Sequence, residues 1–327
     1  MPLSEQCWRE TINFSQAAIL ALSAGMAAAE PVLKLATLEG GTVSWELDTI
    51  THYGLDAAQG FSLEVMPVAG KDASAVALLA GEVDGIVTDW FWVARMRAEG
   101  QDFRFIPYSK AVGGLMVRPE SGITSLADLK GKKIGIAGGP LDKSWLILRA
   151  WAAQQGGFDL AAETEQVFGA PPLIMQAGLS GDVDAAINFW HFMAKMEAGG
   201  MTTLLPVADA ARDLGLDPET PLLGYVLRGE TVDEHPELAK ALADASRAAK
   251  ELLASDPQAF ARLRPIMNAK SDAQFEALKK GFVEGIPANA PVDAEAAGRM
   301  LELMAKLGGE KLVGPVTELP AGTFLSF

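Results

Sequence analysis

Short apolar runs alternate with segments of helical periodicity along most of the chain. The first apolar run covers Val32 to Leu38, and two glycines, Gly40 and Gly41, separate it from a helical pattern that continues to His52. An apolar run of this length bounded by glycines is typical of a buried strand. Strands that alternate with helices favour a mainly parallel sheet covered by helices. The same pattern predicts further strands over residues 62–68, 86–88, 103–108, 114–117, 133–137, 167–168 and 222–227.

One order of elements occurs twice. Residues 79–86 (LAGEVDGI) and residues 179–186 (LSGDVDAA) each follow a helical pattern and precede a strand that ends in aromatic residues. A glycine that ends a helix and an aspartate that caps the next turn would explain either copy alone. Because both copies stand between a helix and a strand, we expect two similarly built lobes.

The pattern after residue 228 is helical. Pro236 suits a first helical position, Asp256 and Pro257 form a cap and first residue, and residues 293–307 end at two glycines. Apolar residues at helical spacing after Pro236 predict core contacts for Leu238, Leu242, Ala245, Ala249 and Leu252.

The first 29 residues have the pattern of a secretory signal. An apolar stretch from about Ala17 to Met26 is followed by three alanines, residues 27–29, which suit signal peptidase. Glu5 and Glu10 depart from the usual basic leader, so an uncleaved N-terminal helix is the alternative. Cleavage after residue 29 removes Cys7, the single cysteine, and a mature chain without cysteine forms no disulfide. We therefore expect a periplasmic protein.

Charge and histidine placement exclude several classes of partner. The formal net charge of −15 disfavours nucleic acid and anionic lipid, since both require a basic face. The histidines, His52, His191 and His235, are scattered, and no metal-ligand spacing is present. We expect neither a metal nor a cofactor.

Four segments resemble the sulfonate-, nitrate- and taurine-type solute-binding proteins of ABC importers, which are related to thiamine-pyrimidine-synthase-like proteins. These segments are residues 77–84 (ALLAGEVD), 125–136 (SLADLKGKKIGI), 171–186 with their paired prolines, and 235–238 (HPEL). The resemblance implies a type II periplasmic binding fold, an α/β architecture of two lobes. Lobe one would be residues 30–117 and 222–327, lobe two residues 118–221, and the crossovers near 115–119 and 222–227 would form the hinge. It also implies a monomer that carries a small-molecule ligand to a membrane permease.

Open α/β sheets bind ligands at the carboxyl ends of their strands, so residues after strands and at helix N-termini are candidates for the interlobe cleft. The predicted ligand-binding residues are Glu39, Trp45, Lys71, Asp89, Trp90, Trp92, Gly138, Gly139, Lys143, Ser144, Trp145, Asn188, Trp190 and His191.

Three groups within this set have distinct expected roles. The glycine turn before Lys143 and Ser144 offers a helix N-terminus to an anion, unless it is only a turn with a solvated lysine. The indoles offer flat apolar walls, although core packing would explain any single one. Glu39 and Asp89 could pair an amine, or act as a helix cap or an interlobe ion pair. A ligand that used both the turn and the carboxylates would be zwitterionic.

Two other functions remain open at this point. The chain could be a periplasmic enzyme on the same fold, but the mature part lacks the cysteines of pyrimidine-forming relatives and shows no nucleophile elbow. It could also be a binding fold recruited as a receptor or assembly factor. We expect a solute-binding protein without catalytic activity.

Overall fold

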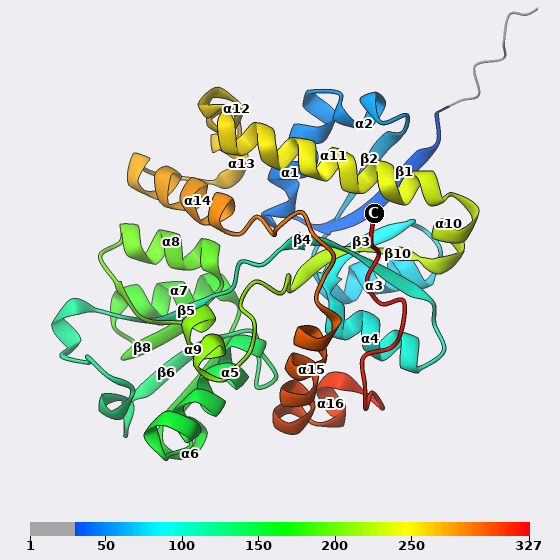
Figure 1. Ribbon diagram of the computed structural model, residues 1–327. Coiled ribbons are helices and arrows are strands. Elements are labelled where there is room, and N and C mark those ends of the chain that lie inside the picture. Colours follow the sequence, from blue (N-terminus) through cyan, green and yellow to red (C-terminus); the bar gives the residue numbers. More distant parts are fainter. Residues whose placement is uncertain (1–29) are drawn as a thin grey trace, which may run out of the picture. The chain divides into compact units, whose positions relative to one another are not determined.

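A computed structural model of the protein describes residues 30–327. The predicted signal segment, residues 1–29, lies outside the described residues. The described chain contains two five-stranded sheets, and we call each sheet with its covering helices a lobe (Figure 1).

The first sheet has the strand order β2-β1-β3-β10-β4. β1 pairs in parallel with β2 and β3, whereas β10 is antiparallel to both β3 and β4. Leu33, Leu35 and Ala36 of β1 are buried on both faces of the sheet, as the apolar run predicts. The strands are β1 (Val32–Leu38), β2 (Ser62–Val68), β3 (Gly85–Asp89), β4 (Phe103–Ser109) and β10 (Leu223–Arg228).

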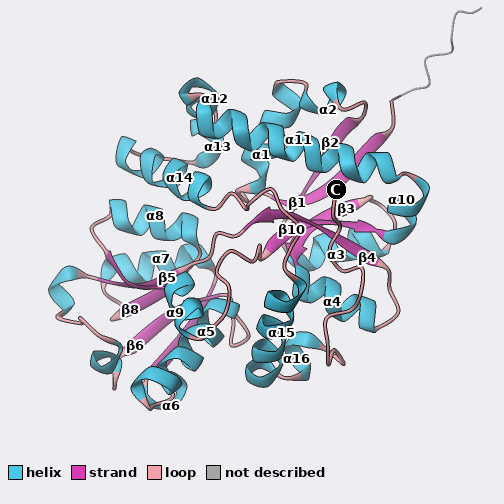
Figure 2. Ribbon diagram, in the orientation of Figure 1, coloured by secondary structure: helices cyan, strands magenta, loops and turns pink. Residues whose placement is uncertain are grey.

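The second sheet repeats this arrangement with the order β7-β6-β8-β5-β9. β6 lies parallel between β7 and β8, and β5 is antiparallel to β8 and β9. Figure 2 shows the two sets of strands. The strands are β5 (Gly114–Val117), β6 (Lys133–Ala137), β7 (Glu165–Gly169), β8 (Ala185–Asn188) and β9 (Thr202–Pro206).

The repeated sequence has the same structural role in both lobes. The Asp84 carboxylate accepts the backbone N–H of Lys34 at 2.8 Å, and the Asp184 carboxylate accepts that of Lys133 at 2.9 Å. The preceding glycines have positive φ angles, +77° at Gly81 and +88° at Gly181, which a side chain would disfavour. The motif therefore ends a helix and fixes the start of the central strand in each lobe.

Helices cover both faces of the first sheet. One face carries α1 (Val43–His52), α2 (Leu55–Ala58), α11 (Pro236–Ser255), α12 (Pro257–Arg262), α13 (Arg264–Met267) and α14 (Asp272–Glu284). The other carries α3 (Lys71–Leu79), α4 (Trp90–Ala98), α15 (Ala294–Gly308) and α16 (Glu310–Val313), while α10 (Gly229–Glu234) follows β10. The predicted core positions Leu238, Leu242, Ala245 and Ala249 of α11 are buried, whereas Leu252 is half-buried.

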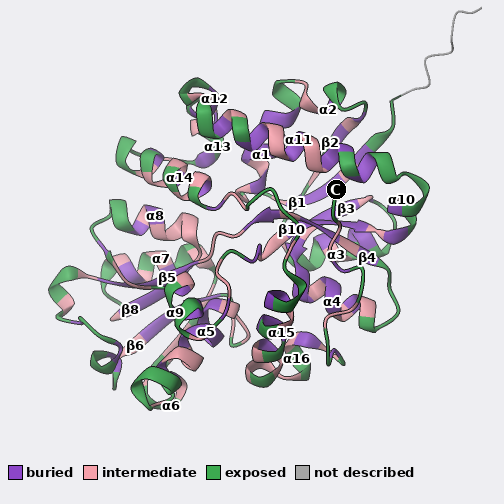
Figure 3. Cartoon of the chain, in the orientation of Figure 1, coloured by how far each residue is buried: buried purple, intermediate pink, exposed green. Residues whose placement is uncertain are grey.

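The second sheet is covered in the same way. One face packs against α5 (Lys143–Trp151), the short π-helix Ala152–Gly156 that continues it, α6 (Leu160–Glu163) and α9 (Val207–Asp213). The other packs against α7 (Pro171–Ser180) and α8 (Trp190–Ala198). Two short 3₁₀ turns, Pro119–Ser121 and Leu126–Leu129, precede β6, and the second has the predicted Ser125–Asp128 capping box. Figure 3 shows the buried strands beneath exposed helix faces.

The chain crosses between the lobes at residues 110–113 and 214–222. β5 was expected in the first lobe, but it pairs with β8 and β9 of the second sheet. A Cβ on Gly113 would lie 1.9 Å from the carbonyl oxygen of Asn188, so a glycine there lets the chain enter the second sheet. The first crossover therefore lies before the expected residues 115–119. The sequence did not reveal this, because β5 pairs with strands that lie much further along the chain. β9, a half-exposed edge strand, was not expected.

Candidate functional site

Residues from three parallel strands meet at one edge of the first sheet. β1, β2 and β3 are neighbours that end in Leu38, Val68 and Asp89, so Glu39, Lys71 and Asp89 follow or end adjacent strands. In the second sheet, β6 and β8 are neighbours that end in Ala137 and Asn188. Several of the residues that the sequence predicted for the site follow these two edges.

An ion pair joins the two edges. The Asp89 carboxylate accepts the backbone N–H of Trp92 at 3.2 Å, which caps α4, and accepts the Lys143 ammonium at 2.8 Å. Burial alone would raise the pKa of Asp89, but the charges of Lys143 and Lys71 and the two hydrogen bonds lower it. Asp89 is therefore ionised at neutral pH and holds Lys143 of the other lobe.

The glycine turn of the second lobe already contains an anionic group. Asp142 caps α5 by accepting the backbone N–H of Trp145 at 3.1 Å. A Cβ on Gly138, whose φ is +95°, would lie 3.7 Å from the Asp142 carboxylate. Burial raises the pKa of Asp142, although Trp145, Lys143 and Lys71 partly oppose it. The expected open anion site at this helix N-terminus is thus corrected, since the carboxylate occupies it; Asp142 was recognisable as an N-cap residue.

A second cross-lobe contact is aromatic. The ring of Trp45, in the first turn of α1, meets the ring of Trp190 in α8 edge-on, with centroids 5.9 Å apart. Trp45 also lies 6.0 Å from Phe282 of α14. A Cβ on Gly281 would come within 2.7 Å of the Trp190 ring, so this glycine leaves room for the indole. The contact places Trp45 and Trp190 where α14 packs against α8.

The other predicted indoles belong to the interiors of the lobes. Trp90 is 0% exposed, stacks on Phe91 with centroids 3.9 Å apart, and meets Phe324. Trp145 is 2% exposed, and half-buried Trp92 packs on Phe103. This corrects the expectation that all these indoles wall a crevice. α4 and α5 begin directly after strand-end turns, so their first apolar residues fold back onto the sheets.

The remaining predicted residues differ in whether their polar atoms are already hydrogen-bonded within the protein and in how far they are exposed. The Asn188 amide donates to the carbonyl oxygen of Pro171 at 2.9 Å and accepts the N–H of Phe189 at 2.9 Å, so it acts as a structural group. Ser144 is buried, Gly139 is half-buried, and Glu39 and Gly138 are exposed. A ligand contact by the exposed residues remains a prediction.

His191 stands at the beginning of α8 beside Trp190. Within residues 30–327 its Nδ1 is buried without a hydrogen-bond partner. Burial, together with the nearby charge of Lys195, lowers the pKa of His191 to about 4. The imidazole is therefore neutral at physiological pH.

A buried charge network behind Trp45 was not expected from the sequence. Glu46 accepts hydrogen bonds from the Tyr225 and Ser246 hydroxyls, each at 2.6 Å, and pairs with the Lys250 ammonium at 2.7 Å. Burial lowers the pKa of Lys250, while Glu46 opposes that shift. The ammonium also lies 4.8 Å from the Tyr108 ring centroid. The sequence signal that could have revealed this network is a charged residue among the apolar positions of a buried helix face, Glu46 in α1 and Lys250 in α11.

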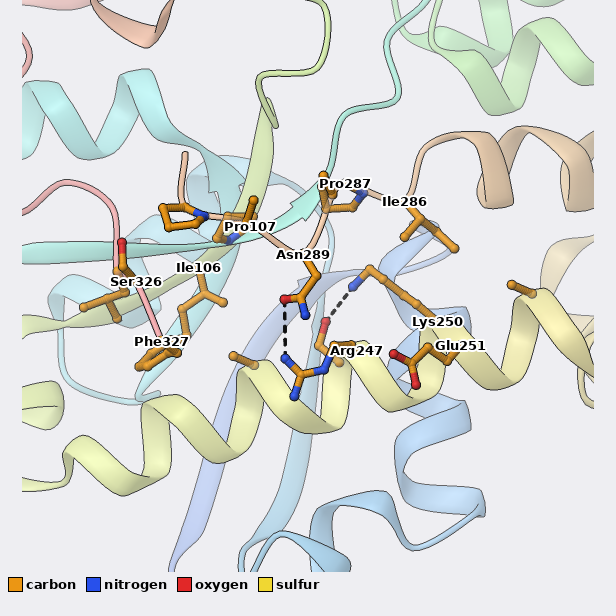
Figure 4. A pocket seen from close by; sticks show the side chains of 17 residues that line it. Ile106, Pro107, Arg247, Lys250, Glu251, Ile286, Pro287, Asn289, Ser326 and Phe327 are labelled. Atoms are coloured by element: carbon orange, nitrogen blue, oxygen red, sulfur yellow. Dashed lines mark hydrogen bonds between the residues drawn. The ribbon is translucent and has the colours of Figure 1, made fainter. Parts of the chain in front are cut away.

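A sizeable cavity in the described chain lies outside the two strand edges. It measures about 410 Å³ and lies between α11, β4, residues 286–291 and the C-terminal residues 325–327 (Figure 4). Lys250 and Arg247 line it, and Arg247 reaches Asn289 at 3.5 Å. A much smaller cavity lies between the lobes, lined by Lys143 and Ile147 on one side and Phe91, Thr220 and Met300 on the other. Cavity size alone therefore does not indicate the strand-edge site.

Residues 30–327 contain neither a membrane-spanning helix nor a cluster of metal-ligating side chains. None of the helices within residues 30–327 has the length and apolar character that crossing a bilayer requires. In the same residues, no cluster of three or more His, Cys, Asp or Glu side chains is arranged to hold a metal ion.

Two α/β lobes joined by two crossovers, with side chains from facing strand ends in contact, define a type II periplasmic binding fold. Residues 57–260 match the family described as NMT1/THI5 like, and the chain belongs to this family. No curated protein matches the sequence.

Solved structures show the same fold at low sequence identity. The periplasmic aliphatic sulphonate binding protein SsuA from Escherichia coli is 21% identical with a TM-score of 0.68, covering 88% of this chain and 95% of that one. The alkanesulfonate-binding protein SsuA from Xanthomonas axonopodis pv. citri, bound to MOPS, is 16% identical with a TM-score of 0.69, covering 92% and 100%. The periplasmic nitrate-binding protein NrtA from Synechocystis PCC 6803 is 16% identical with a TM-score of 0.57, covering 78% and 70%.

Proposed function

We propose that this protein is the extracytoplasmic solute-binding component of an ABC importer. It captures a small sulfonate-, nitrate- or taurine-like solute, or a nitrogen-containing organic solute, between its lobes and delivers it to a membrane permease. The observation that supports this most directly is the pair of cross-lobe contacts, Asp89 with Lys143 and Trp45 with Trp190, at the carboxyl ends of strands in both sheets. The names of the SsuA and NrtA structures support the same class of function.

Binding follows from opening and closing of the lobes about the two crossovers. When the lobes separate, the Lys143 ammonium leaves the Asp89 carboxylate and the Trp190 ring leaves Trp45. The solute then occupies the space between Glu39, Lys71 and Asp89 on one lobe and the turn before Lys143 on the other. Closure removes water from these charges, which strengthens their interaction with the solute.

The same class of protein implies the boundaries of the lobes, export of the chain, a monomeric state and the lack of a catalytic step. Residues 30–113 and 222–327 serve as lobe one, and residues 114–221, which begin with β5, serve as lobe two. The N-terminal 29 residues direct export to the periplasm and are then removed. The protein acts as a monomer, and it performs no catalytic step on its solute.

A thermal-shift screen tests the proposal. Candidate solutes are taurine, simple sulfonates, nitrate and pyrimidines, at about a hundredfold excess over Kd. A solute that binds only the folded state should stabilise it by about 2.7 kcal/mol at that excess. Lack of stabilisation by every compound, or turnover of a bound compound, would contradict the proposal.

Substitution of a single indole then maps the binding site. Trp190→Ala should weaken binding of the identified solute by roughly tenfold, about 1.4 kcal/mol. Trp151→Ala is the matched control, because Trp151 is also half-buried in lobe two but donates to Asp213 at 2.8 Å, at the opposite end of α5. Equal affinity of the two variants, measured by calorimetry, would remove Trp190 from the site.

A further inference from the structure

The cavity of about 410 Å³ on the first lobe has no role in the proposed function (Figure 4). All of the residues that line it belong to lobe one, and none of them is a predicted ligand-binding residue. Its volume lies within the range of about 300–1,000 Å³ that is usual for small-molecule sites. Ile106 of β4 and Ser246 and Lys250 of α11 form the buried part of its wall. The cavity is therefore large enough to hold a ligand of its own.

The two segments that close the cavity, residues 325–327 and the loop after α14, are held in place. The backbone N–H of Phe105 donates to the carbonyl oxygen of Thr323 at 2.8 Å, and that of Leu325 donates to the carbonyl oxygen of Phe105 at 2.9 Å. Pro287 and Pro291 restrict the loop, because their rings fix φ. A cavity whose walls are fixed beforehand requires little ordering when a ligand binds.

Lys250 contributes an ammonium group with one unsatisfied N–H. Its side chain is 7% exposed, and the ammonium donates to Ser246 Oγ at 2.5 Å and pairs with the Glu46 carboxylate at 2.7 Å. An ammonium has three N–H donors. Within residues 30–327 the third donor has no hydrogen-bond acceptor, and the Tyr108 ring, whose centroid is 4.8 Å away, offers only a cation–π contact. An acceptor on a bound molecule would satisfy this donor.

Arg247 adds a guanidinium group to the same cavity. It pairs with Asp244 at 2.5 Å and donates to the Asn289 amide oxygen at 3.5 Å, which is longer than a usual hydrogen bond (Figure 4). The side chain of Arg247 is 43% exposed, so it can turn toward a bound molecule. A guanidinium fork matches a carboxylate, to which it donates two parallel bonds. A carboxylate in the cavity would thus replace the weak bond to Asn289 with a stronger one.

The rest of the cavity wall is mostly apolar. It includes Ile106, Ile286 and Leu325. Glu251 also lines the cavity, but this residue is exposed, so water and salt screen its charge. Cationic donors beside an apolar wall are complementary to a molecule that has an anionic group at one end and an apolar body at the other.

We propose that this cavity binds a small carboxylate with an apolar body, at a site separate from the interlobe cleft. Lys250 and Arg247 bind the carboxylate, and the apolar body packs against Ile106, Ile286 and Leu325. The proposal does not depend on the proposed function, because the lining residues are distinct from those expected in the cleft.

Titration calorimetry of the full chain with hexanoate tests the ligand class. Hexanoate should bind. The comparison compounds are 1-hexanol, which lacks the charge, and acetate, which lacks the apolar body, and each should bind at least roughly tenfold more weakly. Absence of hexanoate binding, or equal binding of either comparison compound, would overturn the proposal.

Ala243→Leu tests the location, because Ala243 lines the cavity from α11. A leucine there fills part of the cavity and should weaken hexanoate binding roughly tenfold. Ala248→Leu is the matched control, since Ala248 is also half-buried in α11 but does not line the cavity. Equal hexanoate affinity of the two variants would place the carboxylate elsewhere and overturn the proposal.

Arg247→Gln tests the charge and leaves the buried partners of Lys250 in place. Asp244 keeps its pair with Lys240 at 2.6 Å, so the variant should fold, and hexanoate should bind roughly tenfold more weakly. Arg299→Gln removes the same charge from an exposed side chain of α15 and should bind hexanoate as the wild type does. Unchanged hexanoate affinity in Arg247→Gln would contradict the proposal.

Discussion

Two lysine–carboxylate pairs have nearly equal N···O distances, but one lies inside a lobe and the other joins the two lobes. Glu46 and Lys250 are 2.7 Å apart inside the first lobe, with side chains 0% and 7% exposed. Asp89 and Lys143 are 2.8 Å apart across the two lobes, with side chains 8% and 21% exposed. The first pair also bonds Tyr225 and Ser246 and links α1, β10 and α11. Within residues 30–327, neither member of the second pair forms a further hydrogen bond or ion pair with the opposite lobe.

The position of an ion pair, rather than its chemistry, therefore decides what the pair does. A pair enclosed within one lobe can be broken only by unfolding that lobe, so its loss is measured as stability. A pair between two lobes can be broken by their separation, so its loss is measured as a change in conformation. The indoles divide in the same way, since Trp90 lies in a lobe interior and Trp190 lies at the lobe boundary.

Glu46→Ala should have the largest effect on stability. Removing this carboxylate leaves the buried Lys250 ammonium without its counter-ion, with only the Ser246 hydroxyl as acceptor, and leaves the Tyr225 and Ser246 hydroxyls without theirs. This should lower the free energy of unfolding by about 3–5 kcal/mol. The double variant Glu46→Met with Lys250→Met should recover much of the loss, because it removes both charges. Urea unfolding measures all three proteins; equal stability of the single and double variants would contradict this account.

His191 gives the next largest effect, through pH. The folded pKa is about 4, against 6.5 in the unfolded chain, so the unfolded state binds the proton first as pH falls. Stability should therefore decrease between about pH 6.5 and pH 4, by up to about 3 kcal/mol.

The variant His191→Phe isolates this titration. It keeps an aromatic ring beside Phe192 and removes the ionisable group, so its stability should fall less over the same pH range. The exposed His235 provides a control through His235→Phe, which should retain the wild-type pH dependence. Parallel curves for wild type and His191→Phe would show that this imidazole does not govern acid stability.

Asp89→Asn should have the smallest effect on stability and the clearest effect on conformation. Asparagine keeps the cap of α4, and the released Lys143 is partly exposed, so unfolding should change by only about 1 kcal/mol. The lobes should separate more readily, giving a larger radius of gyration in small-angle X-ray scattering. Glu46→Gln should leave that radius unchanged. A larger radius in Glu46→Gln but not in Asp89→Asn would reverse the roles assigned to the two pairs.

Acid should affect the cross-lobe pair only at low pH. Lys143, Lys71 and two hydrogen bonds hold the pKa of Asp89 below its usual range, so its contribution is present at neutral pH and is lost only as pH falls through the lowered folded pKa. Loss of stability from His191 should therefore begin at a higher pH than separation of the lobes.

Much of the fold could be predicted because its signals are local. The apolar run Val32–Leu38 formed a buried strand, the two glycine–aspartate repeats marked equivalent turns, and the stripe beginning at Leu238 formed a core helix. These signals are local because burial of a segment is recorded in the spacing of its own apolar residues. They also carried the resemblance that led to the family.

Local sequence signals were therefore enough to predict an α/β chain with two similar lobes, whereas the strand ends at which a solute would bind stay a prediction. Only the tertiary structure decided which side chains meet there. Glu46 pairs with Lys250, which lies more than two hundred positions further along the chain. β5 belongs to the second sheet, and Asp142 caps the helix at the turn that had been expected to bind an anion. The physical reason is that periodicity specifies which face of an element is buried, whereas its partner depends on how distant segments pack.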